Sequence, residues 1–308
     1  MAIQSGRSAA AVYEEAPLRR VSMRGTARAY LELSKARLSA MVVLTTAVGY
    51  VMAGPVPFDT ARFLLTIIGT CLAAWGANAL NQWHEADRDA LMLRTRTRPL
   101  PAGRIGRSAA LAYGLIVGLA GPALLAATVS PAAAVLALVT LVVYVLIYTP
   151  TKVRTPLNTL VGAVVGAIPP VIGWVAAVER FEAGAWIIGG ILFLWQIPHF
   201  LALAWLYRED YARGGFRMLP AVDPSGRLTG YVSVAYSLLL IPLASLLSVM
   251  QVATWWYGLG AILAGAGLTA ASVAFERDRE DAAARRLFVV SLVYLPVLLA
   301  LMVAGRAP

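Results

Sequence analysis

Long apolar runs recur along the sequence from about residue 38 to residue 304, and polar or charged residues separate each run from the next. A run of about 17–25 apolar residues has the length of a helix that crosses a bilayer. Within lipid a single segment satisfies its own backbone only as a helix. We therefore predict an all-α, polytopic membrane protein with nine transmembrane helices. The expected spans are 38–54, 62–82, 108–128, 131–148, 157–177, 183–205, 229–250, 254–274 and 286–304.

Composition agrees with this class. Of the 308 residues, 59% are hydrophobic and only 14% are charged, with a mean hydropathy of +0.72. A soluble domain could not bury so much apolar surface. The single cysteine, Cys71, lies in an apolar run and has no partner for an internal disulfide. Residues 1–27 are charged throughout and lack the apolar core of a secretory signal. We expect an N-terminal tail over 1–27 and one membrane domain over 28–308.

The positions of the basic residues predict the orientation. With the N-terminus in the cytoplasm, every lysine and arginine except Arg62, Arg180 and Arg306 falls before the first span or in or beside a cytoplasmic loop. Such an excess marks the cytoplasmic side, and an odd number of spans then places the C-terminus on the opposite side. The net charge of +10 is explained by this distribution, so no nucleic-acid partner is expected.

Charged residues crowd into the stretch from Asn81 to Arg104, directly after the second apolar run. If the helix continues past Leu80, Asn81, Glu85 and Asp89 follow one another at intervals of four and share one face. Oxygen ligands with two or three anions suit Mg²⁺, which takes one or two carboxylates together with substrate phosphates. The alternative is a charged loop that only ends a helix at the membrane surface. The carboxylates are Glu85, Asp87 and Asp89, and the arginines are Arg88, Arg94, Arg96, Arg98 and Arg104.

A second polar stretch begins inside the sixth span. Gln196 and His199 flank Pro198 in an otherwise apolar run, and polar groups at such depth usually face the bundle interior. His199 is either a functional residue or a satisfied hydrogen-bonding partner between helices. The span ends in a charged loop in which Asp210 is a second candidate for binding metal or phosphate. The loop also carries Tyr207, Arg208, Glu209, Tyr211, Arg213 and Arg217.

Two further features lie between these stretches. Lys152 and Arg154 bring positive charge next to Asn158, where a helix begins and favours an anion at its N-terminus. A tight basic turn at the membrane surface is the alternative. Pro169 and Pro170 should break or bend the fifth span. The glycines around the two prolines suit either a cavity lining or close packing of helices.

Taken together, these motifs resemble the intramembrane aromatic prenyltransferases, and within them the branch of protohaem IX farnesyltransferases. The resemblance covers about residues 30–220. It rests on the segments NALNQWHEADRD (78–89), MLRTRTRP (92–99), YTPTKVRTPLN (148–158), GAIPPVIGW (166–174), WQIPH (195–199) and YREDYARGGFRMLP (207–220).

The resemblance implies a bundle of nine helices around a central cavity that opens to the cytoplasmic face and to the lipid. It implies farnesyl diphosphate and haem B as substrates, haem O as product, and Mg²⁺ as cofactor. It also implies residence in the bacterial inner membrane or an equivalent energy-coupling membrane, with a haem A synthase as a partner. A quinone precursor or another ring as the acceptor remains an alternative, and a secondary transporter is a more distant one.

The resemblance also assigns roles to residues. Asn81, Glu85 and Asp89 match the first metal–diphosphate motif, and Asp87 is an additional acid of the branch. Arg94, Arg98 and Lys152 match the basic residues for the diphosphate, with Arg154 replacing an arginine that often stands at Val153. Of the second acidic motif only Asp210 is retained, and Tyr207 and Tyr211 stand at the neighbouring acidic positions. We expect His199 to orient the haem or ligate its iron.

Overall fold

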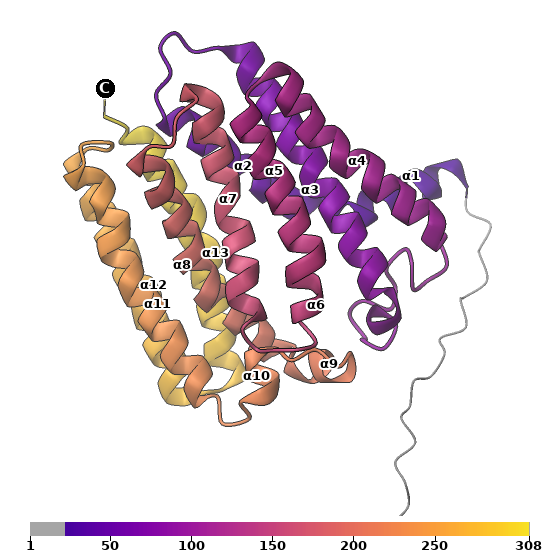
Figure 1. The fold of residues 1–308 in the computed structure, drawn as a ribbon. Helices are drawn as coiled ribbons and strands as arrows, with labels where there is room; N and C mark the ends of the chain where they lie inside the picture. Colours follow the sequence, from indigo (N-terminus) through magenta and orange to yellow (C-terminus); the bar gives the residue numbers. More distant parts are fainter. Residues whose placement is uncertain (1–21, 308) are drawn as a thin grey trace, which may run out of the picture.

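The computed structural model describes residues 22–307, and the regular elements of this part of the chain are helices (Figure 1). One isolated bridge joins Ala253 and Arg306. The helices are α1 (Met23–Leu33), α2 (Ala36–Met52), α3 (Thr60–Asp89), α4 (Arg107–Thr128), α5 (Pro131–Val142), the π-helix η1 (Val143–Tyr148), α6 (Thr149–Thr151), α7 (Asn158–Val178), α8 (Ala183–Leu206), α9 (Arg208–Arg213), α10 (Leu219–Val222), α11 (Arg227–Val249), α12 (Trp255–Asp278) and α13 (Asp281–Ala304).

Each predicted apolar run lies within a helical stretch, to within about two residues at either end. Eight helical stretches in the described chain are long and apolar enough to cross a membrane, with α5, η1 and α6 together forming one of them. The first predicted run corresponds to α2, a shorter apolar helix of 17 residues. That length is at the lower limit of about 17–25 residues for a span. The all-helical membrane fold is confirmed, whereas the count of nine crossings stays a prediction.

The tail predicted over 1–27 lies mostly outside the described residues. Its last part enters α1, so the predicted boundary between residues 27 and 28 falls inside a helix. One face of α1 packs on α3, α4 and the loop between them, where Ala29 and Leu33 are buried with Ala79 and Ala110. The division at residue 27 stays a prediction.

The long helices run side by side and alternate in direction (Figure 1). Successive loops therefore lie at opposite ends of the bundle. Helices that are neighbours in sequence pack together. In addition, α2 contacts α3, α7 and α13, so it connects the start of the chain with its last helix. The largest apolar core lies among α2, α7, α8, α11, α12 and α13. The end of α3, the short helices α6 and α9, and the α9–α10 loop gather at one end. The predicted charged loops therefore meet on a single face.

The opposite end is held by two arginines. Arg62 donates to the carbonyl of Val129 at 2.7 Å and pairs with Glu179. Arg306 donates to the carbonyl of Val51 at 3.1 Å, so the C-terminal segment is fastened to the end of α2. These contacts tie together loops that are far apart in the sequence.

The expectation that Pro169 and Pro170 break their helix is wrong, because α7 is continuous through both prolines, and the expected bend stays a prediction. The glycines of α7 serve close packing. A Cβ on Gly173 would lie 1.9 Å from the carbonyl oxygen of Thr46 in α2, and one on Gly166 would lie 2.0 Å from Oε1 of Gln196 in α8. Close approach of backbones through small residues is the usual way in which membrane helices associate.

Gly49 of α2 makes the reciprocal contact, and its replacement tests this packing. A Cβ there would lie 2.0 Å from the carbonyl oxygen of Pro170, a backbone atom that cannot move aside. We expect Gly49→Ala to lower the free energy of unfolding in detergent by about 1–3 kcal/mol. Gly267→Ala is the control, since a Cβ at Gly267 meets no atom within 4 Å. Equal thermal stability of the two variants would contradict the packing.

Candidate active site

The acidic residues of the first motif occupy the last turns of α3. This helix begins after Asp59, whose carboxylate caps it by accepting from the amide of Arg62 at 2.9 Å. It continues without interruption to Asp89, so the predicted register is present. Asn81, Glu85 and Asp89 are 0%, 4% and 1% exposed. A loop that merely ends a helix at the surface would leave these side chains in solvent, so the surface-loop alternative does not describe them.

Three basic side chains from different segments reach these oxygens. Lys152 Nζ donates to Glu85 Oε1 at 2.8 Å, and Arg98 donates to Asp89 Oδ2 at 2.6 Å. Lys35 Nζ donates to Asn81 Oδ1 at 2.8 Å. We call these six residues the charged cluster. Three basic side chains face two carboxylates, an arrangement that suits an anion such as a diphosphate.

Lys35 was not predicted as a site residue. It lies between α1 and α2 and adopts a left-handed backbone conformation with φ of 47°, which non-glycine residues seldom occupy outside functional or strained positions. Burial, together with the charges of Arg98 and Lys152, lowers the pKa of Lys35 to about 7. In the sequence it is one of the basic residues that precede the first apolar run, and it counted only toward the positive charge of the cytoplasmic side.

Lys152 is presented by an irregular stretch of helix. The π-helix η1 leads into α6, and π-turns within helices are frequent at functional sites. Lys152 Nζ lies 4.5 Å from the centre of the Tyr148 ring, and Thr149 Oγ1 accepts from the amide of Asn81 at 3.1 Å. Burial alone would lower the pKa of Lys152, but the carboxylate of Glu85 outweighs burial and raises it.

The oxygens of the cluster fit a magnesium ion that is shared with a substrate. Asp89 Oδ1 is buried and has no hydrogen-bond partner among the described residues. Within residues 22–307, no three His, Cys, Asp or Glu side chains converge to form a metal cage. Mg²⁺ usually binds one or two carboxylates together with waters and substrate phosphates. Glu85 and Asp89, with the amide of Asn81, provide such a partial ligand set.

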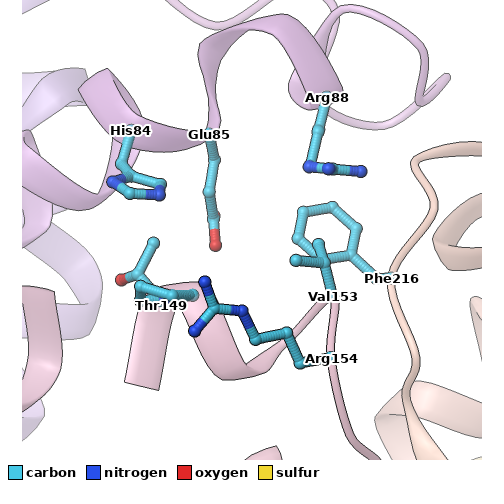
Figure 2. A pocket seen from close by; sticks show the side chains of 8 residues that line it. His84, Glu85, Arg88, Thr149, Val153, Arg154 and Phe216 are labelled. Atoms are coloured by element: carbon cyan, nitrogen blue, oxygen red, sulfur yellow. The ribbon is translucent and has the colours of Figure 1, made fainter. Parts of the chain in front are cut away.

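A cavity of ≈ 270 Å³ adjoins the cluster at this end of the bundle. Figure 2 shows the Glu85 carboxylate between His84 and Arg88, directed toward the segment that contains Thr149 and Arg154. The lining of mixed charge and polarity is suited to the anionic part of a substrate. Sequence reasoning did not assign His84 or Arg88, because nothing in their spacing distinguishes them from other polar residues. The remaining lining residues are Pro150, Val153 and Phe216.

Asp210 joins two loops of the charged face. Its carboxylate accepts from the backbone amides of Leu93 at 2.8 Å and Arg94 at 3.2 Å, and from Arg213 at 2.9 Å. Burial raises the pKa of Asp210, but these donors outweigh burial and lower it. The Arg94 guanidinium lies 4.9 Å from the centre of the Tyr207 ring. It also donates to the Tyr211 hydroxyl at 3.3 Å. Asp210 thus fixes the loop that carries Arg94.

We expect Asp210→Asn to loosen this loop. The asparagine amide cannot accept two backbone N–H groups with both of its polar atoms, so one donor loses its partner. Hydrogen exchange measured on a peptide covering Leu93 and Arg94 should become faster. Glu209→Gln, at an exposed neighbouring position, is the control. Unchanged exchange in Asp210→Asn would show that the carboxylate does not hold the loop.

Several other predicted site residues make contacts outside the charged cluster. Asp87 is exposed and pairs with Arg107 at 2.8 Å, and Arg208 pairs with Asp281 at 2.7 Å, so neither joins the charged cluster. Asn158 donates to the carbonyls of Thr155 and Arg217, and its Oδ1 is buried without a partner among residues 22–307.

His199 belongs to a different part of the bundle from the charged cluster. Its Nδ1 lies 2.8 Å from the Ser291 hydroxyl on α13. The predicted roles of Asp87, Arg208, Asn158 and His199 stay predictions.

Ionisable side chains buried within a helical membrane bundle mark a functional site. The model of the UbiA prenyltransferase family matches residues 42–293. The chain belongs to this family.

Similar proteins agree with this family assignment, and solved structures agree with the helical fold. A protein named protoheme IX farnesyltransferase from Opitutus terrae is 42% identical over 278 residues, which cover 90% of this chain and 94% of that protein. A mitochondrial protein of the same name from Homo sapiens is 42% identical over 90% of this chain and 62% of its own length. A UbiA homolog from Archaeoglobus fulgidus, solved with DMAPP and Mg²⁺, has a TM-score of 0.67 at 16% identity, covering 89% of this chain and 98% of its own. A digeranylgeranylglyceryl phosphate synthase has a TM-score of 0.75 at 17% identity, covering 91% and 98%.

Proposed function

We propose that this protein transfers the farnesyl group of farnesyl diphosphate to a vinyl group of haem B and so forms haem O. The observation that supports the prenyl-transfer step is the charged cluster, in which buried acids and half-buried bases from separate segments lie beside a cavity of ≈ 270 Å³. The acceptor is inferred from the relatives named protoheme IX farnesyltransferase, which match about nine-tenths of the chain.

The reaction breaks the bond between C1 of the farnesyl group and the diphosphate oxygen. The electron pair of that bond leaves with the diphosphate, and the terminal carbon of the vinyl group forms the new bond to C1. Water then adds to the inner vinyl carbon and loses a proton, which leaves a hydroxyethyl-farnesyl substituent. The products are haem O, diphosphate and one proton.

The charged cluster supplies the electrostatic part of this chemistry. Lys35, Lys152 and Arg98 would bind the diphosphate oxygens and take up the negative charge that grows on the leaving group. Arg94 and Arg154, at the edge of the site, would contact its outer oxygens. When bound, Mg²⁺ would neutralise the diphosphate as a Lewis acid. Asn81, Glu85 and Asp89 are the residues that would hold it.

The apolar helices would surround the farnesyl chain, the apolar part of the substrate. A farnesyl chain is as apolar as the lipid, so it can enter the bundle from the bilayer while its diphosphate stays at the polar end. The same apolar surroundings exclude water from the reacting carbon and limit hydrolysis. We place the charged end at the cytoplasmic face of a bacterial inner membrane or an equivalent membrane, with a haem A synthase as the enzyme that receives the product.

The test is to incubate the purified protein in lipid nanodiscs with farnesyl diphosphate, Mg²⁺ and haem B, and to analyse the porphyrins by mass spectrometry. We expect a product that carries one added farnesyl group and one added water. Parallel reactions with a quinone precursor, such as 4-hydroxybenzoate, address the alternative acceptor. A prenylated 4-hydroxybenzoate without any haem O would overturn the proposed acceptor, and no prenylated product at all would overturn prenyl transfer.

A further inference from the structure

A cluster of aromatic side chains surrounds His199 away from the charged cluster. The His199 ring is stacked between Trp195 of α8 and Phe288 of α13, with both ring centroids 4.9 Å away at interplanar angles of 19° and 23°. Ser291, one turn along from Phe288, contacts His199 Nδ1 through its hydroxyl at 2.8 Å. We call Trp195, His199, Phe288 and Ser291 the histidine cluster. None of these contacts serves the diphosphate.

The hydrogen bonds of Ser291 determine which ring nitrogen of His199 carries the proton. The Ser291 hydroxyl donates to the carbonyl of Phe288 at 2.7 Å, and a carbonyl can only accept. Having used its one hydrogen there, the hydroxyl must accept from His199 Nδ1–H. A neutral imidazole has a single N–H. This network therefore assigns the proton to Nδ1 and leaves a lone pair on Nε2.

The cluster also fixes the orientation of the ring. Two stacked neighbours restrict its tilt, and the bond to Ser291 restricts rotation within its own plane. Trp195 is itself anchored, because its indole N–H donates to the Ser291 carbonyl at 2.8 Å. Ser291 therefore holds both the histidine and the larger of the two rings that enclose it. An imidazole oriented in this way is prepared to act through its remaining nitrogen.

The remaining nitrogen, Nε2, has no hydrogen-bond partner among the described residues and is not fully buried. His199 is 9% exposed, and no hydrogen bond of the described residues uses Nε2. Because Nε2 has no partner and is not among the fully buried atoms of residues 22–307, part of its surface is accessible. Ligating histidines usually donate their other N–H to a fixed acceptor, which sets the tautomer and ring orientation. His199 and Ser291 reproduce that arrangement with a serine as the acceptor.

We propose that Ser291 is a positioning residue that presents His199 Nε2 as an axial ligand for the iron of a haem-type porphyrin acceptor. The inference rests on the proposed function, which supplies an iron porphyrin as the acceptor, and imidazole is a suitable ligand for iron. The competing explanation is a hydrogen bond that only joins α8 to α13. That explanation accounts for the contact at Nδ1 but gives no role to the oriented lone pair on Nε2.

The test is a spectroscopic titration of the purified protein with haem B in nanodiscs, followed by the Soret band and by electron paramagnetic resonance of the ferric state. We expect the wild type to show imidazole ligation. His199→Gly should lose this signature and regain it when free imidazole is added. Ser291→Ala should weaken haem binding about 10–100-fold, the usual effect of removing a partner of a metal ligand. Ser245→Ala, which removes a similar helix-internal hydroxyl in α11, should bind haem like the wild type.

A pair of nearly isosteric variants separates positioning from packing. Ser291→Thr keeps the hydroxyl and should bind haem about as tightly as the wild type, whereas Ser291→Val removes the hydroxyl at almost the same volume and should weaken haem binding about 10–100-fold, as Ser291→Ala does. Equal haem affinities for the threonine and valine variants, or a wild-type spectrum in His199→Gly, would overturn the inference. If haem O still forms in those circumstances, the proposed function stands. Absence of haem O from the wild-type assay would refute the proposed function instead.

Discussion

Replacing Glu85 with glutamine is expected to reduce the rate of haem O formation at least about 100-fold, the scale found when one preorganised electrostatic group is removed from an active site. Glutamine retains the size of the side chain and one acceptor oxygen but lacks the negative charge that would hold Mg²⁺. The measurement is kcat and KM for farnesyl diphosphate at several Mg²⁺ concentrations. Asp278→Asn, an exposed acid at the charged end of α12, is the control for the change in net charge.

A loss of folding must be separated from a loss of chemistry. Glu85→Gln leaves Lys152 buried without its ion-pair partner, and breaking such a pair costs about 3–5 kcal/mol of stability. The double variant Glu85→Gln/Lys152→Met removes both charges, so it should recover much of the thermal stability while remaining inactive. Near-normal turnover in a well-folded Glu85→Gln protein would refute the role of this carboxylate.

Replacing Lys35 with methionine is expected to have the next largest effect, a decrease of about 10²–10³-fold in kcat/KM for farnesyl diphosphate. Methionine has a similar length and suits a buried position, but it provides neither a charge nor a donor for the diphosphate. Lys35 contacts Asn81 and lies within electrostatic reach of Glu85 and Asp89, so its charge acts directly on the cluster. Binding of farnesyl thiodiphosphate, which is transferred far more slowly, measures the loss of affinity separately from turnover.

Arg37→Met is the matched control for Lys35→Met. Arg37 lies two residues further along and is exposed, so its replacement removes the same charge from the same segment without touching the cluster. We expect activity close to that of the wild type. If Lys35→Met and Arg37→Met bound the thiodiphosphate equally well, Lys35 would have only a structural role at the start of α2.

The helices and the first acidic motif were predictable because their signals are local. Runs of apolar residues set the membrane helices, and the spacing of Asn81, Glu85 and Asp89 places them on one face once α3 continues past Leu80. The continuity of α3 follows from its residues, since the stretch after Leu80 contains no proline or glycine before Asp89. Each of these signals involves residues that lie within two or three helical turns of one another.

The partners of these residues were not predictable in the same way. Lys35, Lys152 and Arg98 come from three separate segments, and their convergence on α3 depends on how α2, α6 and the following loop pack. Asp210 shows the same limit. Its motif suggested a metal ligand, a role that stays a prediction, but gave no sign that its carboxylate accepts from two backbone amides of a loop far away in sequence.

The continuity of α7 through Pro169 and Pro170 shows a further limit of local signals. Neighbouring helices allow proline within membrane helices, and α7 packs closely against α2, a contact that only the tertiary structure shows.

The central claim is that the acidic end of α3 binds a prenyl diphosphate together with a divalent cation. The most direct measurement is calorimetric binding of farnesyl thiodiphosphate to the protein in nanodiscs, with and without Mg²⁺, for the wild type and for Asp89→Asn. We expect tight binding by the wild type that requires Mg²⁺ and is weakened at least about 100-fold in Asp89→Asn. Binding that is independent of Mg²⁺, or equally tight in the variant, would contradict the account.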